Sequence, residues 1–113
     1  MTAEPERPSN SRAIKAHSEA VYDAFMTMRD TITALGPLPP HMCEVIRCSH
    51  FAALGVKSGF MSHGAQALEW GATPDELRHA VLVTLGNNAI FARVGEGLRW
   101  VDELERQRQA VDK

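Results

Sequence analysis

Large apolar residues recur every three, four or seven positions through the first third of this chain, and that spacing places them on one face of an α-helix. The series is Ile14, Val21, Phe25, Met28, Ile32 and Leu35. It predicts a single helix of about two dozen residues, with Ser11 as a suitable N-cap. The sequence GPLPP at residues 36–40 then ends the helix, because glycine suits a helix C-terminus and proline cannot continue the backbone ladder.

Two further helices are expected directly after this connector. Residues 41–54 contain only two residues of the charged types Asp, Glu, Lys and Arg, namely Glu44 and Arg47, so they predict a mostly buried helix that ends at Gly55. Residues 57–70 follow with helical periodicity and with many small side chains. Small residues allow another backbone to approach closely or leave room for a ligand.

The second half of the chain predicts two more helices. Thr73, Pro74 and Glu76 have the spacing of a capping box with proline at the first helical position. The helix they begin is interrupted by GNN at residues 86–88, and a last helix extends to about Gln109. The side chains expected to face the core are Leu77, Ala80, Val81, Thr84, Leu85, Ile90, Val94, Leu98, Val101 and Leu104. The predicted fold class is therefore all-α, with about five helices.

Length and charge limit the class of protein further. The chain has 113 residues, with 12 Lys and Arg against 14 Asp and Glu and no basic run interleaved with aromatic residues. We expect a disordered polar tail at residues 1–10 and a single helical domain at 11–113. The charge pattern argues against nucleic acid as a partner, and the short apolar runs argue against a membrane. A cytoplasmic protein is expected.

A helical chain this short buries only part of its apolar surface by itself. Association with copies of itself, as an obligate homo-oligomer, is therefore expected. Cys43 and Cys48 lie five positions apart on one predicted helix, so their Cα atoms are roughly 8–9 Å apart, beyond the reach of a disulfide. Both are expected to be reduced and buried.

The histidines point to acid–base chemistry and not to a metal. No two of them have the spacing of three or four residues that places two imidazoles on one helical face, so we expect no metal. A glycine-rich phosphate loop is also lacking, and no cofactor is expected. His63 shares a predicted inward stripe with Val56, Phe60 and Ala67. It is either a core histidine that a backbone carbonyl satisfies, or a functional group beside the space left by Gly59.

Glu44 is an acid in an otherwise almost apolar helix, and a buried carboxylate must be paired, hydrogen-bonded or protonated. One alternative is a surface pair with Arg47, three residues further along the helix. The other is a contact with His63 across the two predicted helices. That contact would form an acid–base pair able to move protons near neutral pH.

These residues belong to a longer pattern. The pattern consists of Glu44, ALG at 53–55, His63, AL at 67–68, GATPDEL at 71–77 and Gly86. Over roughly residues 38–98 it resembles the carboxymuconolactone decarboxylase and alkylhydroperoxidase D superfamily. The resemblance implies an all-helical alkylhydroperoxidase D-like fold, assembly as a homotrimer or homohexamer, and active sites near the subunit contacts.

The peroxidase branch of that superfamily carries a Glu, then a Cys-x-x-Cys pair, then a His four residues after the second cysteine. If Glu44 and His63 are that Glu and His, the cysteines fall on Val56 and Gly59, and neither is cysteine. Thiol peroxidase chemistry by this route is therefore not expected. The lactone decarboxylase branch also lacks the cysteines, but it tends to have an acid at the position of Gly59 and none at that of Glu44.

The leading hypothesis is a cofactor-free lyase that decarboxylates a small carboxylated or lactone substrate, or isomerises it by a related proton transfer. His63 and Glu44 are the expected catalytic pair, with His63 as general acid or base and Glu44 orienting it. The residues expected to bind the substrate are Lys57, Ser58, Gly59, Asn87, Asn88 and Arg93. A simple turn is the alternative for the two asparagines, and an exposed, unused position is the alternative for Arg93.

Two other functions remain open at this point. The chain can be an oligomer that binds a ligand or a protein without turning it over, because a fold does not imply a function. Redox activity through Cys43 or Cys48 would require an accessible thiolate, and burial on a helix argues against it.

Overall fold

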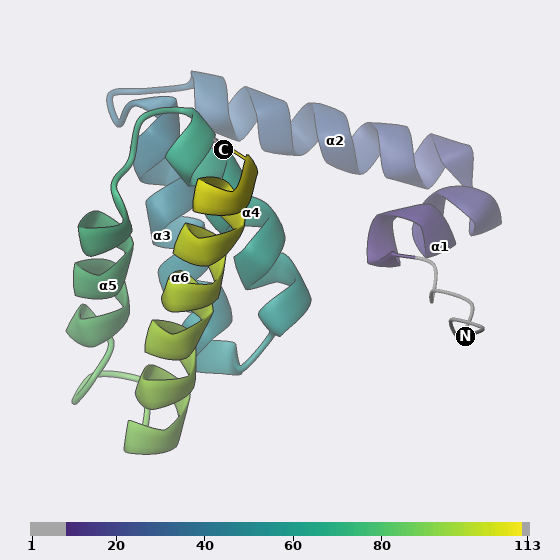
Figure 1. Ribbon diagram of the computed structural model, residues 1–113. Coiled ribbons are helices and arrows are strands. Elements are labelled where there is room, and N and C mark those ends of the chain that lie inside the picture. Colours follow the sequence, from purple (N-terminus) through teal and green to yellow (C-terminus); the bar gives the residue numbers. More distant parts are fainter. Residues whose placement is uncertain (1–8, 112–113) are drawn as a thin grey trace. The chain divides into compact units, whose positions relative to one another are not determined.

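The structure, a computed structural model, describes residues 9–111, and this range is built from helices (Figure 1). The helices are α1 (Asn10–His17), α2 (Glu19–Ala34), α3 (Pro40–Leu54), α4 (Lys57–Glu69), α5 (Pro74–Val83) and α6 (Phe91–Val111). The all-α prediction is confirmed, with six helices in the described range where about five were expected. They form two compact units, one ending at Gly36 and the other beginning at Pro37.

The additional helix arises because the prediction of one long N-terminal helix is wrong. The helix is interrupted at Ser18, whose backbone is extended with φ −155° and ψ 108°. The hydroxyl of Ser18 accepts a hydrogen bond from the amide of Val21. Serine favours this break because its side chain competes with the helix for backbone hydrogen bonds. The N-cap of α1 is Ser9, whose hydroxyl accepts from the amide of Arg12, and not Ser11.

Residues 9–36, the described part of the first unit, include no buried residue. All six large apolar side chains of the predicted series are at least 49% exposed. Helices of 8 and 16 residues with no buried face are marginally stable in water. Of the tail expected at residues 1–10, residues 1–8 lie outside the described range, and Asn10 begins α1.

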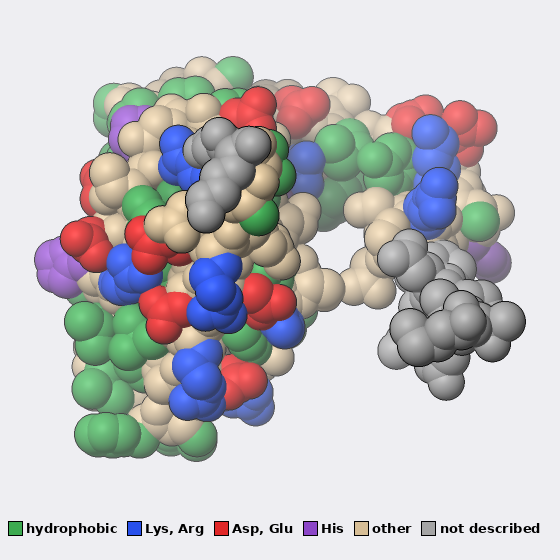
Figure 2. All heavy atoms as spheres, viewed as in Figure 1, with side chains coloured by type: hydrophobic (Ala, Val, Ile, Leu, Met, Phe, Trp, Pro, Cys, Tyr) green, Lys and Arg blue, Asp and Glu red, His purple; other side chains and the backbone are tan. Residues whose placement is uncertain are grey.

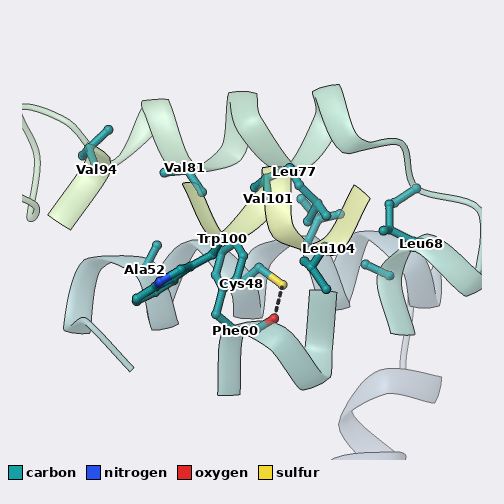
Figure 3. Close-up of a cluster of buried hydrophobic side chains, with 13 residues drawn as sticks. Cys48, Ala52, Phe60, Leu68, Leu77, Val81, Val94, Trp100, Val101 and Leu104 are labelled. Carbon is teal, nitrogen blue, oxygen red and sulfur yellow. Dashed lines mark hydrogen bonds between the residues drawn. The ribbon is translucent and has the colours of Figure 1, made fainter. Parts of the chain in front are cut away.

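Helices α3, α4, α5 and α6 pack around one apolar core. In Figure 1, α6 lies in front of α3, and both lie between α5 and α4. The largest fully buried side chains are Phe60, Leu77, Val81, Val101 and Cys48. Figure 3 shows them with Trp100, whose ring centroid lies 5.3 Å from that of Phe60. All four helices contribute to this core, so it fixes the positions of α3 and α4 relative to each other.

The helix ends in this second unit follow the local sequence signals. Gly55 ends α3 in the left-handed region, with φ 75°. The hydroxyl of Thr73 accepts from the amide of Glu76 at 3.1 Å, and the carboxylate of Glu76 accepts from the amide of Thr73 at 2.8 Å. The predicted capping box, with Pro74 at the first position of α5, is therefore confirmed.

The turn between α5 and α6 differs from the prediction. Leu85 and Ile90 were expected to face the core, but they are 39% and 68% exposed. The cause is that α5 already ends at Val83, after which the amides of residues 87–89 all bond to the carbonyl of Thr84 in a tight turn. The exposed hydrophobic side chains here, which we name the turn patch, are Leu82, Val83, Leu85, Ile90 and Phe91. Figure 2 shows hydrophobic side chains gathered at this end of the second unit.

Small residues in α4 and α6 allow neighbouring helices to approach closely. A Cβ atom on Gly64 would lie 2.4 Å from Cδ1 of Leu104. On Gly97 it would lie 2.9 Å from Cγ1 of Val81 and 3.1 Å from Cβ of Ala52. Both glycines are therefore packing residues at helix crossings, where any side chain would push the partner away.

We predict opposite effects of alanine at two glycines of α6. Gly95→Ala should raise the free energy of unfolding by about 1 kcal/mol, because alanine is the better helix former and the only atom near the new methyl group is Nη1 of Arg99 at 3.9 Å. Gly97→Ala should instead lower it by about 1–2 kcal/mol through overpacking against α3 and α5. Urea denaturation of both variants tests this, and equal effects would contradict the close packing at Gly97.

Candidate acid–base site

Glu44 of α3 and His63 of α4 are in direct contact. Oε2 of Glu44 lies 2.5 Å from Nδ1 of His63. The tight turn after Gly55 folds α4 back along α3, as short connections between helices do, and this brings the two side chains together. The side chain of Glu44 is 5% exposed and that of His63 is 15% exposed. A carboxylate and an imidazole therefore share a largely water-free position between two helices.

The two alternatives considered for Glu44 occur together. Oε1 of Glu44 accepts a hydrogen bond from Nη1 of Arg47 at 2.8 Å, while Oε2 faces His63. A buried carboxylate needs a positive partner or several hydrogen bonds to offset its lost hydration. Arg47, whose side chain is 20% exposed, supplies that charge from the solvent side. Glu44 is thus bonded on both oxygens.

This arrangement leaves the second ring nitrogen of His63 for chemistry. A carboxylate oxygen only accepts hydrogen bonds, so Nδ1 of His63 carries the hydrogen in the contact with Glu44, and Nε2 holds a lone pair in the neutral ring. In the part of the chain that the structure describes, no buried side-chain nitrogen or oxygen lacks a partner. Because Nε2 has no partner, it reaches the surface, where it can take up or give a proton.

The space expected beside Gly59 is filled, and that expectation is wrong. The ring of Phe51 stacks on the imidazole of His63, with centroids 5.3 Å apart and planes 13° apart. A Cβ atom on Gly59 would lie 2.4 Å from Cε1 of Phe51. Glycine is present at this position because the phenyl ring needs the room, and the ring in turn holds the plane of His63.

Cys48 lies behind Glu44, one turn further along α3, and it is fully buried. Burial, with the negative charge of Glu44 as a smaller cause, raises the pKa of its thiol to about 12. Its Sγ donates a weak hydrogen bond to the carbonyl of Phe60 at 3.8 Å (Figure 3). A thiol that stays protonated is neither a nucleophile nor a redox centre, which argues against redox activity through Cys48. Cys43 is also a free thiol and is half-buried.

Three of the residues expected to bind substrate lie near the turn between α3 and α4. Nζ of Lys57 forms an ion pair with Oε2 of Glu103 at 3.0 Å, and Ser58 is exposed beside it. The guanidinium of Arg93 lies against Gly55. A Cβ atom added to Gly55 would be 1.5 Å from Nη1 of Arg93. Arg93 of α6 thus lies at the end of α3, whereas the ammonium of Lys57 is held by Glu103 of α6. Lys57 begins α4 six residues before His63, about 9 Å along the helix by the helical rise.

Asn87 and Asn88 belong to the turn after α5. Both are exposed, and Nδ2 of Asn87 donates to the carbonyl of Val83 at 3.2 Å. Across the described residues, neither asparagine nor Arg93 makes a hydrogen bond or an ion pair with Glu44 or His63. The structure thus brings Gly59 and His63 together, since both contact Phe51. The two asparagines lie in a simple turn, which was the alternative to a role in substrate binding.

Among the described residues, surface hollows of about 300–420 Å³ lie between α4 and α6, between α1 and α2, and between α3 and α5. None of the three is lined by Glu44 or His63. Within residues 9–111, no group of three or more His, Cys, Asp or Glu side chains is placed to hold a metal ion. None of the helices there combines the length and apolar character that crossing a membrane requires.

Comparison of the chain with protein-family models, with curated proteins and with solved structures finds no match.

Sequence reasoning missed two members of this site. Phe51 was seen only as one apolar residue of a buried helix, although it stacks on His63. Arg47 was considered only as an alternative to His63, although it binds the other oxygen of Glu44. The position of Phe51, two turns after Glu44 on one helix and facing a glycine on the next, is a signal that could have suggested it.

We predict that Glu44→Ala lowers the free energy of unfolding by about 3 kcal/mol, because it leaves the partners of a buried ion pair without their carboxylate. The matched control is Glu103→Ala. Its partner Lys57 is 52% exposed, and an exposed pair contributes less than about 1 kcal/mol. Chemical denaturation at pH 7 measures both. Equal losses would mean that the Glu44 cluster adds no stability beyond a surface pair.

The raised pKa of Cys48 predicts a loss of stability at high pH. Between the ordinary value of 9.0 and about 12, the unfolded chain releases the thiol proton while the folded chain keeps it, so stability falls as pH rises. The contribution is up to about 1.4 kcal/mol per pH unit above pH 9. Denaturation of wild type and Cys48→Ala at pH 8 to 11 should show this additional slope in wild type alone, and parallel curves would disprove the burial effect.

Proposed function

We propose that this chain is a cofactor-free enzyme that decarboxylates a small carboxylated or lactone substrate, or isomerises it by a related proton transfer. The observation that carries the proposal is the contact between Glu44 and Nδ1 of His63, which leaves Nε2 as the group that exchanges a proton with substrate. The resemblance to carboxymuconolactone decarboxylases and the absence of cysteine at positions 56 and 59 favour this class over thiol peroxidases.

The proposed steps use the two ring nitrogens differently. In decarboxylation, the bond from carbon to the carboxylate breaks, carbon dioxide leaves with the carboxylate oxygens, and the electron pair stays on carbon. Protonated His63 then gives its Nε2 proton to that carbon. In isomerisation, neutral Nε2 removes a proton from one carbon and returns it to another. In both reactions Glu44 holds Nδ1 and offsets the positive charge of the protonated ring, which is present at the start of decarboxylation and forms during isomerisation.

The groups around the site would bind the acidic part of the substrate. Arg93 lies against Gly55 at the end of α3, and its positive charge suits a carboxylate. Lys57 would join it by exchanging its ion pair with Glu103 for the substrate. Ser58, at the start of α4, adds a hydroxyl there. We include in the proposal the homotrimer or homohexamer that the resemblance implies, and a cytoplasmic location. In such an assembly, a neighbouring copy can close the open side of His63.

A second candidate function is the binding of a ligand or a protein without turnover. One observation favours the absence of turnover at His63: Phe51 covers one face of the imidazole, and none of the three hollows described above includes His63. A site with no room for substrate would keep the acid–base pair for stability alone.

We predict that His63→Ala lowers turnover by at least about 100-fold, the usual contribution of a general acid or base. The control is His50→Ala, an exposed histidine on α3. A thermal-shift panel of small lactones, keto acids and aromatic acids identifies ligands of wild type, and release of carbon dioxide or loss of substrate is then measured for each. Unchanged turnover in His63→Ala would overturn the enzyme proposal. Binding without turnover in wild type would support the second candidate.

A further inference from the structure

The apolar side of α2 has a regular repeat that nothing in its own unit covers. Ser18, at the N-cap, begins a series of positions alternately three and four apart, which is the a/d repeat of a coiled coil. The series is Ser18, Val21, Phe25, Met28, Ile32 and Leu35. We name it the α2 seam. None of its side chains is buried, and the strict a/d stripe is narrower than the face by which a helix covers a globular core.

The residues beside the α2 seam suit close approach to another helix. The flanking positions hold Ala24 and Thr31 on one side and Tyr22 and Arg29 on the other. The three acidic residues of α2 lie on the opposite side of the helix: Glu19, Asp23 and Asp30. Two such seams can therefore meet without opposing like charges other than the single arginine of each helix.

The elbow between α1 and α2 contains a hollow of about 300 Å³, lined by Ala13, Ile14, His17, Ser18 and Val21. At the far end of the same helix, Leu35 is 80% exposed, the most exposed side chain of the seam. An apolar hollow and an apolar side chain of matching kind thus lie at opposite ends of α2.

We propose that α2 pairs with α2 of a second copy of this chain in antiparallel orientation, with Leu35 of each copy seated in the elbow hollow of the other. In this register Val21 faces Ile32 of the second copy, and Phe25 faces Met28. Ser18, the one seam position without an apolar side chain, faces Leu35. The contact is a two-fold, self-complementary interface.

The antiparallel register also brings compatible side chains together at the positions that flank the α2 seam. It sets Tyr22 opposite Arg29 of the second copy, where a guanidinium can lie over a phenol ring. It also sets Ala24 opposite Thr31, and these small side chains let the backbones approach. A parallel pair would face Leu35 with Leu35, leave both elbow hollows empty, and align the helix dipoles unfavourably. A second copy is the natural occupant because it carries the same repeat.

A two-fold contact has a consequence for the assembly. A closed trimer contains no two-fold axis, whereas a hexamer built of two trimers does. Of the homotrimer and homohexamer in the proposed function, the pairing therefore selects the hexamer. This selection rests on the proposed assembly, but the pairing itself does not, since it involves neither Glu44 nor His63.

The register is tested by disulfide cross-linking of the full chain. Phe25→Cys and Met28→Cys are made separately, each with Cys43→Ser, and each is oxidised alone or mixed with the other. We expect covalent dimers mainly in the mixture, because position 25 faces position 28 of the other copy. Dimers formed equally by each variant alone would show parallel pairing, and no dimers in any sample would show that the seams do not meet. Either result overturns the proposal.

The surface is tested by sedimentation of Met28→Glu beside Phe91→Glu, a matched change in the turn patch. Met28 is 53% exposed and Phe91 is 81% exposed, so neither change disturbs the core, and circular dichroism checks this. We expect Met28→Glu to lower the mass of the assembly at least two-fold and Phe91→Glu to leave it unchanged. The reverse result would make the turn patch the contact surface and overturn the proposal. Neither experiment measures activity. A result that overturns the α2 pairing would therefore not contradict the proposed enzymatic function.

Discussion

The burial of one carboxylate governs how the second unit is arranged. Glu44 has lost nearly all contact with water, and it remains acceptable only because each oxygen has a donor. One donor comes from its own helix, Arg47, and the other from the next helix, His63. The contact of this charge with His63 adds a constraint on the rotation of α3 against α4, whose relative positions the shared apolar core sets. The same contact sets which nitrogen of the imidazole faces inward.

The small residues of α4 do not leave empty space, because neighbouring side chains pack directly against them. Gly59 accommodates the ring of Phe51, and Gly64 accommodates Leu104. As a result the imidazole of His63 is held by a carboxylate at its edge and by an aromatic ring on its face. Such a group has few rotamers available to it. The single chain offers a well-oriented proton carrier whose side chain is 15% exposed.

The features that could be predicted from the sequence are those set by residues close together in the chain. The end of α3 at Gly55 and the capping box at Thr73 depend on backbone geometry within four residues, so their signals are local. The pairing of Glu44 with His63 could be named as one of two possibilities, because both lie on predicted inward faces. The break at Ser18 and the exposure of Ile90 could not be predicted from periodicity. In both places a side-chain or turn hydrogen bond outweighs an otherwise continuous apolar spacing.

The connectivity of the second unit also bears on how quickly it forms. α3 and α4 are neighbours in sequence and in space, as are α5 and α6, and the first pair is joined by the two-residue turn at Gly55 and Val56. Contacts between elements so near in sequence require little loop closure before they form, and domains dominated by such contacts fold within microseconds to milliseconds. The N-terminal helices, having nothing buried, add no slow step. This chain should therefore complete its core soon after synthesis, leaving little time in which the side chains of that core lie open to aggregation.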